Sequence, residues 1–199
     1  GCALLPGSFN PLHHAHLHLA RLAEERLGKP VMYEISVENV DKPPLTAGEI
    51  CERLEQFDGE KRRVALTREP LYSGKARLFP GCTFVIGYDT AARLFDPRYY
   101  GGDAEAMLGA LAEIRAAGCD FLVAGREVEA EFRTLADLDV PDGFEGLFHG
   151  LTEEEFRVDI SSSELRARGF ERAAQFSWAR AARETWAVYR QVAGSGAPS

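Results

Sequence analysis

Short apolar runs alternate with amphipathic segments along this chain, and that order limits the folds it can adopt. The runs are rich in the β-branched and aromatic residues that suit strands, while apolar residues in the segments between them recur every three or four positions, as in helices. Buried strands that are each followed by a helix form a parallel sheet with helices on both faces, so we expect an α/β fold. The expected strands are residues 2–5, 31–37, 63–67, 83–86 and 120–124, and the expected helical stripes are residues 17–27, 104–117 and 178–192.

The length of 199 residues leaves room for one domain with extensions, because domains average about 150 residues. We expect a single domain over residues 1–193 and a flexible Gly/Ser-rich tail over residues 194–199. The four cysteines form no CxxC pair, and we expect them to be reduced, mostly buried thiols.

The net charge limits the kinds of partner that this chain can bind. Thirty-one acidic and 23 basic residues give a net charge of −8, which disfavours a surface that tracks the phosphate backbone of a nucleic acid. No apolar run approaches the ~18 residues that span a bilayer, and the N-terminus lacks a signal-peptide pattern. We therefore expect a cytoplasmic protein with no nucleic-acid or membrane partner, and a homo-oligomer stays open.

Four of the five histidines fall within six positions, in the stretch LPGSFNPLHHAHLH that follows the first expected strand. A turn signal at Asn10-Pro11 precedes the helical stripe, so His13 and His16 are expected at a helix N-terminus and on one face of it. A helix N-terminus carries partial positive charge and free N–H groups, so two imidazoles there favour phosphate binding. The alternatives are that the histidines lie on the surface without a function, or that they bind a metal ion adventitiously, for which the sequence offers no third ligand. For His14 and His18 we expect a solvated or packing role.

Other polar residues also follow expected strands, where parallel sheets bind their ligands. Gly87 and Asp89 follow the fourth strand, Arg126 follows the fifth, and Lys42 follows the second. A helix N-cap explains Asp89 equally well, and exposed charges are the alternative for Lys42 and Arg126. The chain has neither GxGxxG nor GxxxxGK[ST], which argues against a dinucleotide dehydrogenase and a P-loop NTPase.

A second candidate phosphate site lies in the segment DISSSELR over residues 159–166. Ser161 and Glu164 have the spacing of a capping box, which begins a helix and turns backbone N–H groups and hydroxyls outward. Arg166, one turn further on, adds a guanidinium suited to phosphoryl oxygens. The alternative is an ordinary capped surface helix.

Together these two motifs resemble a known superfamily. The stretch GSFNPLHHAH is similar to the HxGH signature of the nucleotidyltransferases with a Rossmann-like fold, and most similar to the nicotinamide and nicotinate mononucleotide adenylyltransferases. The segment 159–166 resembles the ISSTxxR signature of the same superfamily, and GYD at 87–89 resembles its G-x-D segment. Ala15 stands where the family usually has Gly.

The resemblance implies transfer of an adenylyl group from ATP to nicotinamide or nicotinate mononucleotide, with release of pyrophosphate. Mg²⁺ would be bound mainly by substrate phosphates and water, with no metal ligands supplied by the protein. The implied catalytic residues are His13, His16 and Arg166; the implied ATP contacts are Gly7, Ser8, Phe9, Gly87, Asp89, Arg126, Ile160, Ser161 and Ser162; the implied mononucleotide contacts are Asn10 and Lys42.

Several alternatives stay open from the sequence. The acceptor could be phosphopantetheine or a flavin mononucleotide, or the reaction could be CTP transfer to a phosphorylated alcohol. A nucleotide-binding module without turnover and a histidine-rich metal-binding protein are the other classes. An aromatic residue within 95–100 is a candidate for stacking on a pyridine ring, and Trp178 and Trp186 are expected in the core.

Overall fold

The structure is a computed structural model that describes residues 1–40, 43–58 and 62–157. The chain divides into two compact units, Gly1–Ile160 and Ser161–Ser199, and all described residues belong to the first. The expected helical stripe at 178–192, both tryptophans and the expected tail lie outside the described residues.

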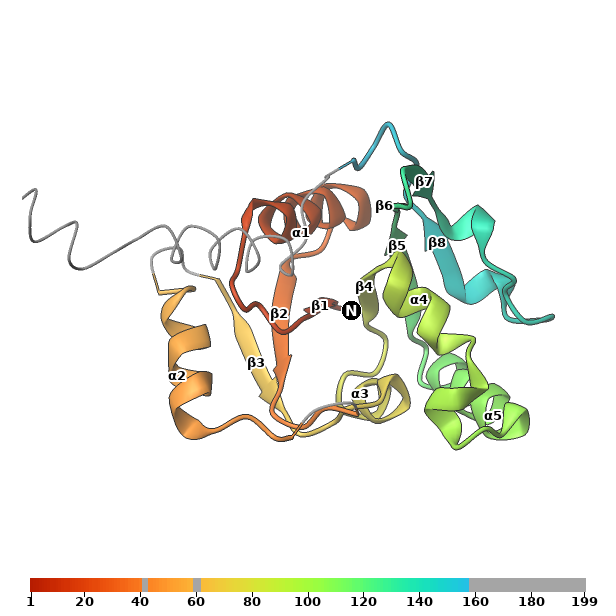
Figure 1. Ribbon diagram of the computed structural model, residues 1–199, viewed down its shortest axis with the longest axis horizontal. Coiled ribbons are helices and arrows are strands. Elements are labelled where there is room, and N and C mark those ends of the chain that lie inside the picture. Colours follow the sequence, from red (N-terminus) through yellow and green to blue (C-terminus); the bar gives the residue numbers. More distant parts are fainter. Residues whose placement is uncertain (41–42, 59–61, 158–199) are drawn as a thin grey trace, which may run out of the picture. The chain divides into compact units, whose positions relative to one another are not determined.

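Six parallel strands form one sheet in the order β3-β2-β1-β4-β5-β8, which runs from left to right in Figure 1. The five strands expected from the sequence are all present, whereas the three-residue β8 and the hairpin β6–β7 were not predicted. The strands are β1 (Ala3–Pro6), β2 (Val31–Ser36), β3 (Val64–Thr67), β4 (Thr83–Gly87), β5 (Asp120–Ala124), β6 (Arg126–Val128), β7 (Glu131–Arg133) and β8 (Phe148–Gly150).

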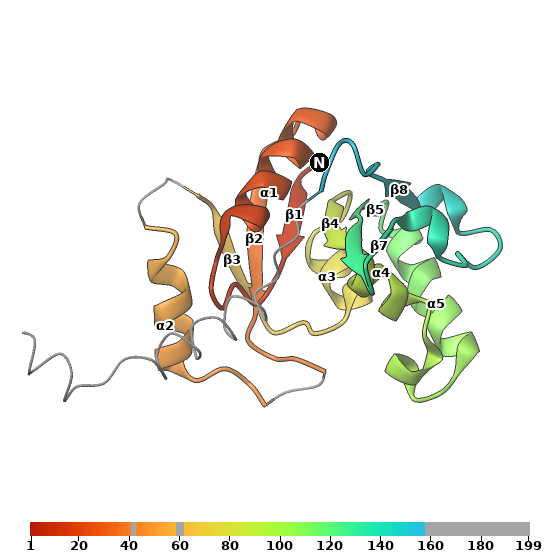
Figure 2. The same cartoon turned by 45° about the horizontal axis from the view of Figure 1, so that its top comes forward.

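Helices connect the strands and cover both faces of the sheet. Leu19, Ala20 and Ala23 of α1 share one buried cluster with Leu5 and Val85, and α1 lies along β1 and β2 in Figure 2. Residues of α3, α4 and α5 form the second cluster on the opposite face, so the predicted α/β fold with two covered faces is confirmed. The helices are α1 (His14–Leu27), α2 (Ala47–Glu55), α3 (Tyr72–Leu78), α4 (Tyr88–Leu94) and α5 (Ala104–Ala116), with 3₁₀ turns η1 (Pro97–Tyr100), η2 (Leu135–Asp137) and η3 (Glu145–Leu147).

The strand order reverses direction beside β1. From β1 the chain proceeds outward to β2 and β3, then returns to β4 on the other side of β1 and continues to β5 and β8. The loops that leave β1 and β4 therefore lead to opposite faces of the sheet. The carboxyl ends of two such strands are the position where open parallel sheets bind ligands.

The cysteines differ from the expectation of four reduced thiols. Cys2 and Cys82 form a disulfide, with their Cα atoms 4.8 Å apart. Ala3 pairs with Thr83 in the sheet, so the residues just before them are neighbours although 80 positions separate them in sequence. Cys51 is exposed and Cys119 is buried, and both are free.

A charged pair lies inside the second face of the sheet. Lys75 of α3 and Glu34 of β2 are 2.7 Å apart (Nζ to Oε1), and their side chains are only 4% and 1% exposed. The Thr67 hydroxyl also donates to the Glu34 carboxylate. Burial lowers the pKa of Lys75, although the Glu34 charge opposes that change. Removing one member alone leaves a buried charge without a counterion, which is the costly case.

We therefore expect Lys75→Met to lower the free energy of unfolding by about 3–5 kcal/mol. The double variant Glu34→Gln/Lys75→Met removes both charges and should recover most of that loss. Urea denaturation at neutral pH measures both. Arg77→Met is the matched control on the same helix, because the Arg77–Glu113 pair is exposed and should change stability by less than about 1 kcal/mol. A single Lys75 variant as stable as this control would contradict the expectation.

Candidate active site at the carboxyl ends of β1, β4 and β5

The loop that leaves β1 is held against the sheet at its first residue. The Gly7 N–H donates to the Glu34 carbonyl oxygen of the neighbouring strand at 2.9 Å. A Cβ atom on Gly7 would lie 2.7 Å from the Phe9 ring, which is too close for any side chain to be accommodated without movement. Gly7 is therefore required for the close approach of Phe9.

Phe9 turns its ring into the core while the residues on either side face solvent. Its φ angle is +41°, in the left-handed region, and its side chain is completely buried. The ring packs edge-on against His16 at 5.0 Å and against Tyr33 at 5.4 Å between centroids. The predicted ATP contact of Phe9 is thus limited to its backbone, whereas Ser8 and Asn10 are exposed.

The histidines occupy the predicted position. Helix α1 begins at His14 with His13 as its N-cap. The rings of His13 and His16 stack with their centroids 3.8 Å apart and their planes at 26°. The His13 backbone N–H donates to His16 Nδ1 at 3.4 Å, so the neutral His16 ring carries its proton on Nε2. Ala15, where the superfamily usually has Gly, is buried in the first turn of α1, which accommodates its methyl group.

Both imidazoles are neutral near pH 7. Burial lowers the pKa of His16 to about 3, and the neighbouring His13 charge adds to the effect. Burial also lowers the pKa of His13, with a smaller contribution from His14. The pair therefore offers neutral N–H donors at a helix N-terminus, a combination that suits phosphoryl oxygens.

At the ends of β4 and β5, two predicted nucleotide contacts meet each other. The carboxylate of Asp89 forms an ion pair with Arg126 Nη1, and the two side chains are 49% and 41% exposed. Gly87 is the N-cap of α4 and Asp89 lies within its first turn, so the alternative interpretation of Asp89 as the N-cap is wrong.

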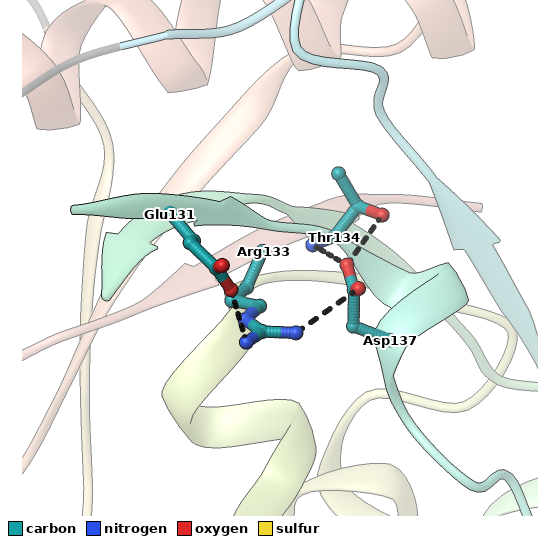
Figure 3. Close-up of polar contacts among 4 residues, drawn as sticks. All are labelled: Glu131, Arg133, Thr134 and Asp137. Atoms are coloured by element: carbon teal, nitrogen blue, oxygen red, sulfur yellow. Dashed lines mark hydrogen bonds and ion pairs between the residues drawn. The ribbon is translucent and has the colours of Figure 1, made fainter. Parts of the chain in front are cut away.

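Arg126 is the first residue of the hairpin β6–β7, which lies directly after β5. A Cβ on Gly125 would lie 2.6 Å from the Arg133 carbonyl oxygen, so the hairpin folds tightly back on the end of β5. The other arginine of the hairpin, Arg133, forms ion pairs with different residues. Arg133 pairs with Glu131 and, at 3.5 Å, with Asp137, while the Asp137 carboxylate accepts from the Thr134 N–H at 2.7 Å (Figure 3).

The remaining candidates take other positions. The Phe95 ring packs edge-on against Phe148, and the Tyr100 hydroxyl donates to the Leu94 carbonyl oxygen at 3.3 Å, so both take part in packing. His14 and His18 line a cavity of about 810 Å³ beside α1, together with Arg21 and Arg62, and none of the predicted site residues lines it. Lys42, Ile160, Ser161, Ser162 and Arg166 lie outside the described residues.

One contact residue was missed by the sequence reasoning. Gln56, the residue after α2, donates to the Phe9 carbonyl oxygen and accepts from the Leu12 N–H. More than 40 positions separate it from that loop, and a glutamine at a helix end carries no local pattern that points to such a partner.

The described residues contain neither a cluster of metal ligands nor a membrane-spanning helix. Within residues 1–40, 43–58 and 62–157, no three His, Cys, Asp or Glu side chains are placed to hold a metal ion. Over the same part of the chain, no helix combines the length and the apolar character needed to cross a membrane.

The fold and the site together define a class. A parallel sheet whose order reverses beside β1, with a histidine pair at the helix N-terminus that follows β1, is the architecture of a Rossmann-like nucleotidyltransferase. The chain matches the sequence profile of the cytidylyltransferase-like family over residues 4–168, and it belongs to this family. Membership implies an enzyme that transfers a nucleotidyl group from a nucleoside triphosphate to an acceptor. None of the curated proteins matches the chain significantly.

The depressed pKa of His16 predicts an acid-dependent loss of stability. Because the unfolded state holds a proton on this imidazole below about pH 6.5 and the folded state does not, the free energy of unfolding should fall as the pH drops from 6.5 toward 3. In His16→Gln this fall should be shallower between pH 7 and 5. Urea denaturation at a series of pH values measures the difference, and parallel curves for the two proteins would contradict the expected cause.

Proposed function

We propose that the protein transfers an adenylyl group from ATP to nicotinamide or nicotinate mononucleotide and releases pyrophosphate. The observation that carries the proposal is the stacked pair of neutral histidines at the N-terminus of α1, beside the reversal in strand order. The motif GSFNPLHHAH, to which this pair belongs, resembles that of the pyridine mononucleotide adenylyltransferases and for that reason favours this acceptor.

The reaction is an in-line displacement at phosphorus. An oxygen of the mononucleotide phosphate attacks the α-phosphorus of ATP, a new P–O bond forms, and the bond to the bridging oxygen of pyrophosphate breaks. No covalent enzyme intermediate is needed, so catalysis comes from positioning and from stabilising charge on the phosphoryl oxygens. His16 Nε2–H and the His13 ring act as the donors at this point.

Other residues bind the two substrates in this proposal. Gly87 and Asp89 contact the ribose of ATP, and Arg126 contacts its phosphates or base. The proposed contacts to the ATP phosphates are Gly7, Ser8, the Phe9 backbone, Ile160, Ser161, Ser162 and Arg166. The proposed contacts to the mononucleotide are Asn10 and Lys42. In this proposal Mg²⁺ would be carried mainly by phosphate oxygens of the substrate and by water, the ligands that this hard cation prefers.

The ion pair between Asp89 and Arg126 bears on how ATP binds. Both side chains are half exposed, and exposed ion pairs contribute only about 0–1 kcal/mol, so the triphosphate can draw Arg126 away at little cost. Without Arg126, the Asp89 carboxylate would face the triphosphate uncompensated and repel it.

The first test measures pyrophosphate release from ATP and Mg²⁺ with each candidate acceptor, in the wild type and in His16→Ala. We expect turnover with a pyridine mononucleotide and a fall in kcat of about 10²–10³-fold in the variant, the usual effect of removing one preorganised donor. Release only with phosphopantetheine or flavin mononucleotide as acceptor, or only from CTP with a phosphorylated alcohol, would keep the mechanism and change the substrate. Binding of ATP without release would favour a non-catalytic module.

The second test compares two arginines of one hairpin. We expect Arg126→Ala to weaken ATP binding about tenfold or more, because a charged hydrogen bond to phosphate is lost and Asp89 is left unpaired. Arg133→Ala removes the same charge from a residue that pairs with Glu131 and Asp137, so its effect should stay below about threefold (Figure 3). Isothermal titration with ATP measures both, and equal effects would exclude a specific contact by Arg126.

A further inference from the structure

Gln56 connects the end of α2 to the loop that carries the histidines. Its Oε1 accepts from the Leu12 N–H at 2.7 Å, and its Nε2 donates to the Phe9 carbonyl oxygen at 2.9 Å. The same Nε2 also lies 3.4 Å from the Arg53 carbonyl oxygen of its own helix. The two loop groups stand on either side of Asn10-Pro11, so one side chain bridges the bend directly before His13.

These contacts need a side chain that donates and accepts at once. A carboxamide does both, whereas a glutamate of the same size is ionised at neutral pH and only accepts. Glutamate at position 56 would still accept from Leu12, but its negative oxygen would face the Phe9 carbonyl oxygen. The site therefore distinguishes two residues of nearly identical shape.

The next residue holds the same loop from inside. The Phe57 ring packs edge-on against the Phe9 ring at 5.5 Å, and the Phe9 ring packs in turn against His16 at 5.0 Å. Phe57 and Phe9 are buried, at 4% and 0% exposure. Residues 56 and 57 thus fix the backbone and the ring of Phe9 together, and Phe9 contacts one of the two histidines.

We propose that Gln56 is a positioning residue of the active site, which acts through the loop from Phe9 to Leu12 and sets the placement of His13 and His16. The proposal rests on the proposed function, in which these histidines contact the phosphoryl group during transfer. A misplacement of about 1 Å in such a site lowers the rate about 10²-fold without removing any contacting residue.

The test compares the wild type with Gln56→Glu, using pyrophosphate release and ATP titration. We expect kcat to fall about tenfold or more, a larger factor than the rise in the Kd for ATP, because Gln56 acts mainly on the geometry of transfer. The double variant Glu55→Gln/Gln56→Glu restores the net charge but still lacks the donor to Phe9, so its kcat should stay as low. Recovery of kcat in the double variant would assign the effect to charge and overturn the proposal, as would an unchanged kcat in Gln56→Glu.

A readout that needs no turnover separates this proposal from the proposed function. In Gln56→Ala the Leu12 N–H loses its acceptor, so its hydrogen exchange by NMR should become at least about tenfold faster, while the amides of α1 keep their rates. Absence of turnover in the wild type would overturn the proposed function alone. Unchanged exchange at Leu12 would overturn the bridging role of Gln56, whatever the activity. Thermal unfolding of each variant checks that the fold is retained.

Discussion

The reversal of strand order beside β1 is the constraint on which the rest of the structure depends. Because β2 and β3 lie on one side of β1 while β4 and β5 lie on the other, the loops after β1 and β4 lead to opposite faces of the sheet, the arrangement in which open sheets bind ligands. Every described residue in the proposed substrate contacts lies in the loop after β1, at the start of α1, or at or just after the ends of β4 and β5. The proposed chemistry thus lies where, among the described residues, the connectivity turns the chain to opposite faces of the sheet.

Buried groups connect the site loop after β1 to the core on both faces of the sheet. Glu34 serves two purposes, since its carbonyl oxygen accepts from Gly7 in the site loop and its carboxylate binds Lys75 and Thr67 on the other face of the sheet. Phe9 makes a similar connection on the first face, where its ring joins the core and its backbone continues into the turn before His13. The position of the loop is therefore set by interior packing on both sides of the sheet.

The fold could be predicted from local periodicity, whereas contacts between residues far apart in the sequence could not. The five expected strands and the helix N-terminus at His13 were found because each is encoded within a few consecutive residues. The three-residue β8 is too short for a period to be recognised. Cys2 and Cys82, Asp89 and Arg126, and Gln56 with Leu12 each meet only through strand order, which no single segment carries. The predicted roles of Lys42 and of residues 160–166 stay predictions.

The neutrality of the two stacked imidazoles has a consequence for discrimination among anions. A protonated histidine pair at a helix N-terminus would attract small anions from solution by charge alone. His13 and His16 stay uncharged because burial lowers the pKa of each. They therefore select an oxygen atom by hydrogen bonds from fixed N–H donors, and not by attraction between opposite charges. In a chain of net charge −8, a free inorganic anion would gain little from such a pair, whereas a nucleotide whose phosphates carry their own counterion would be repelled less.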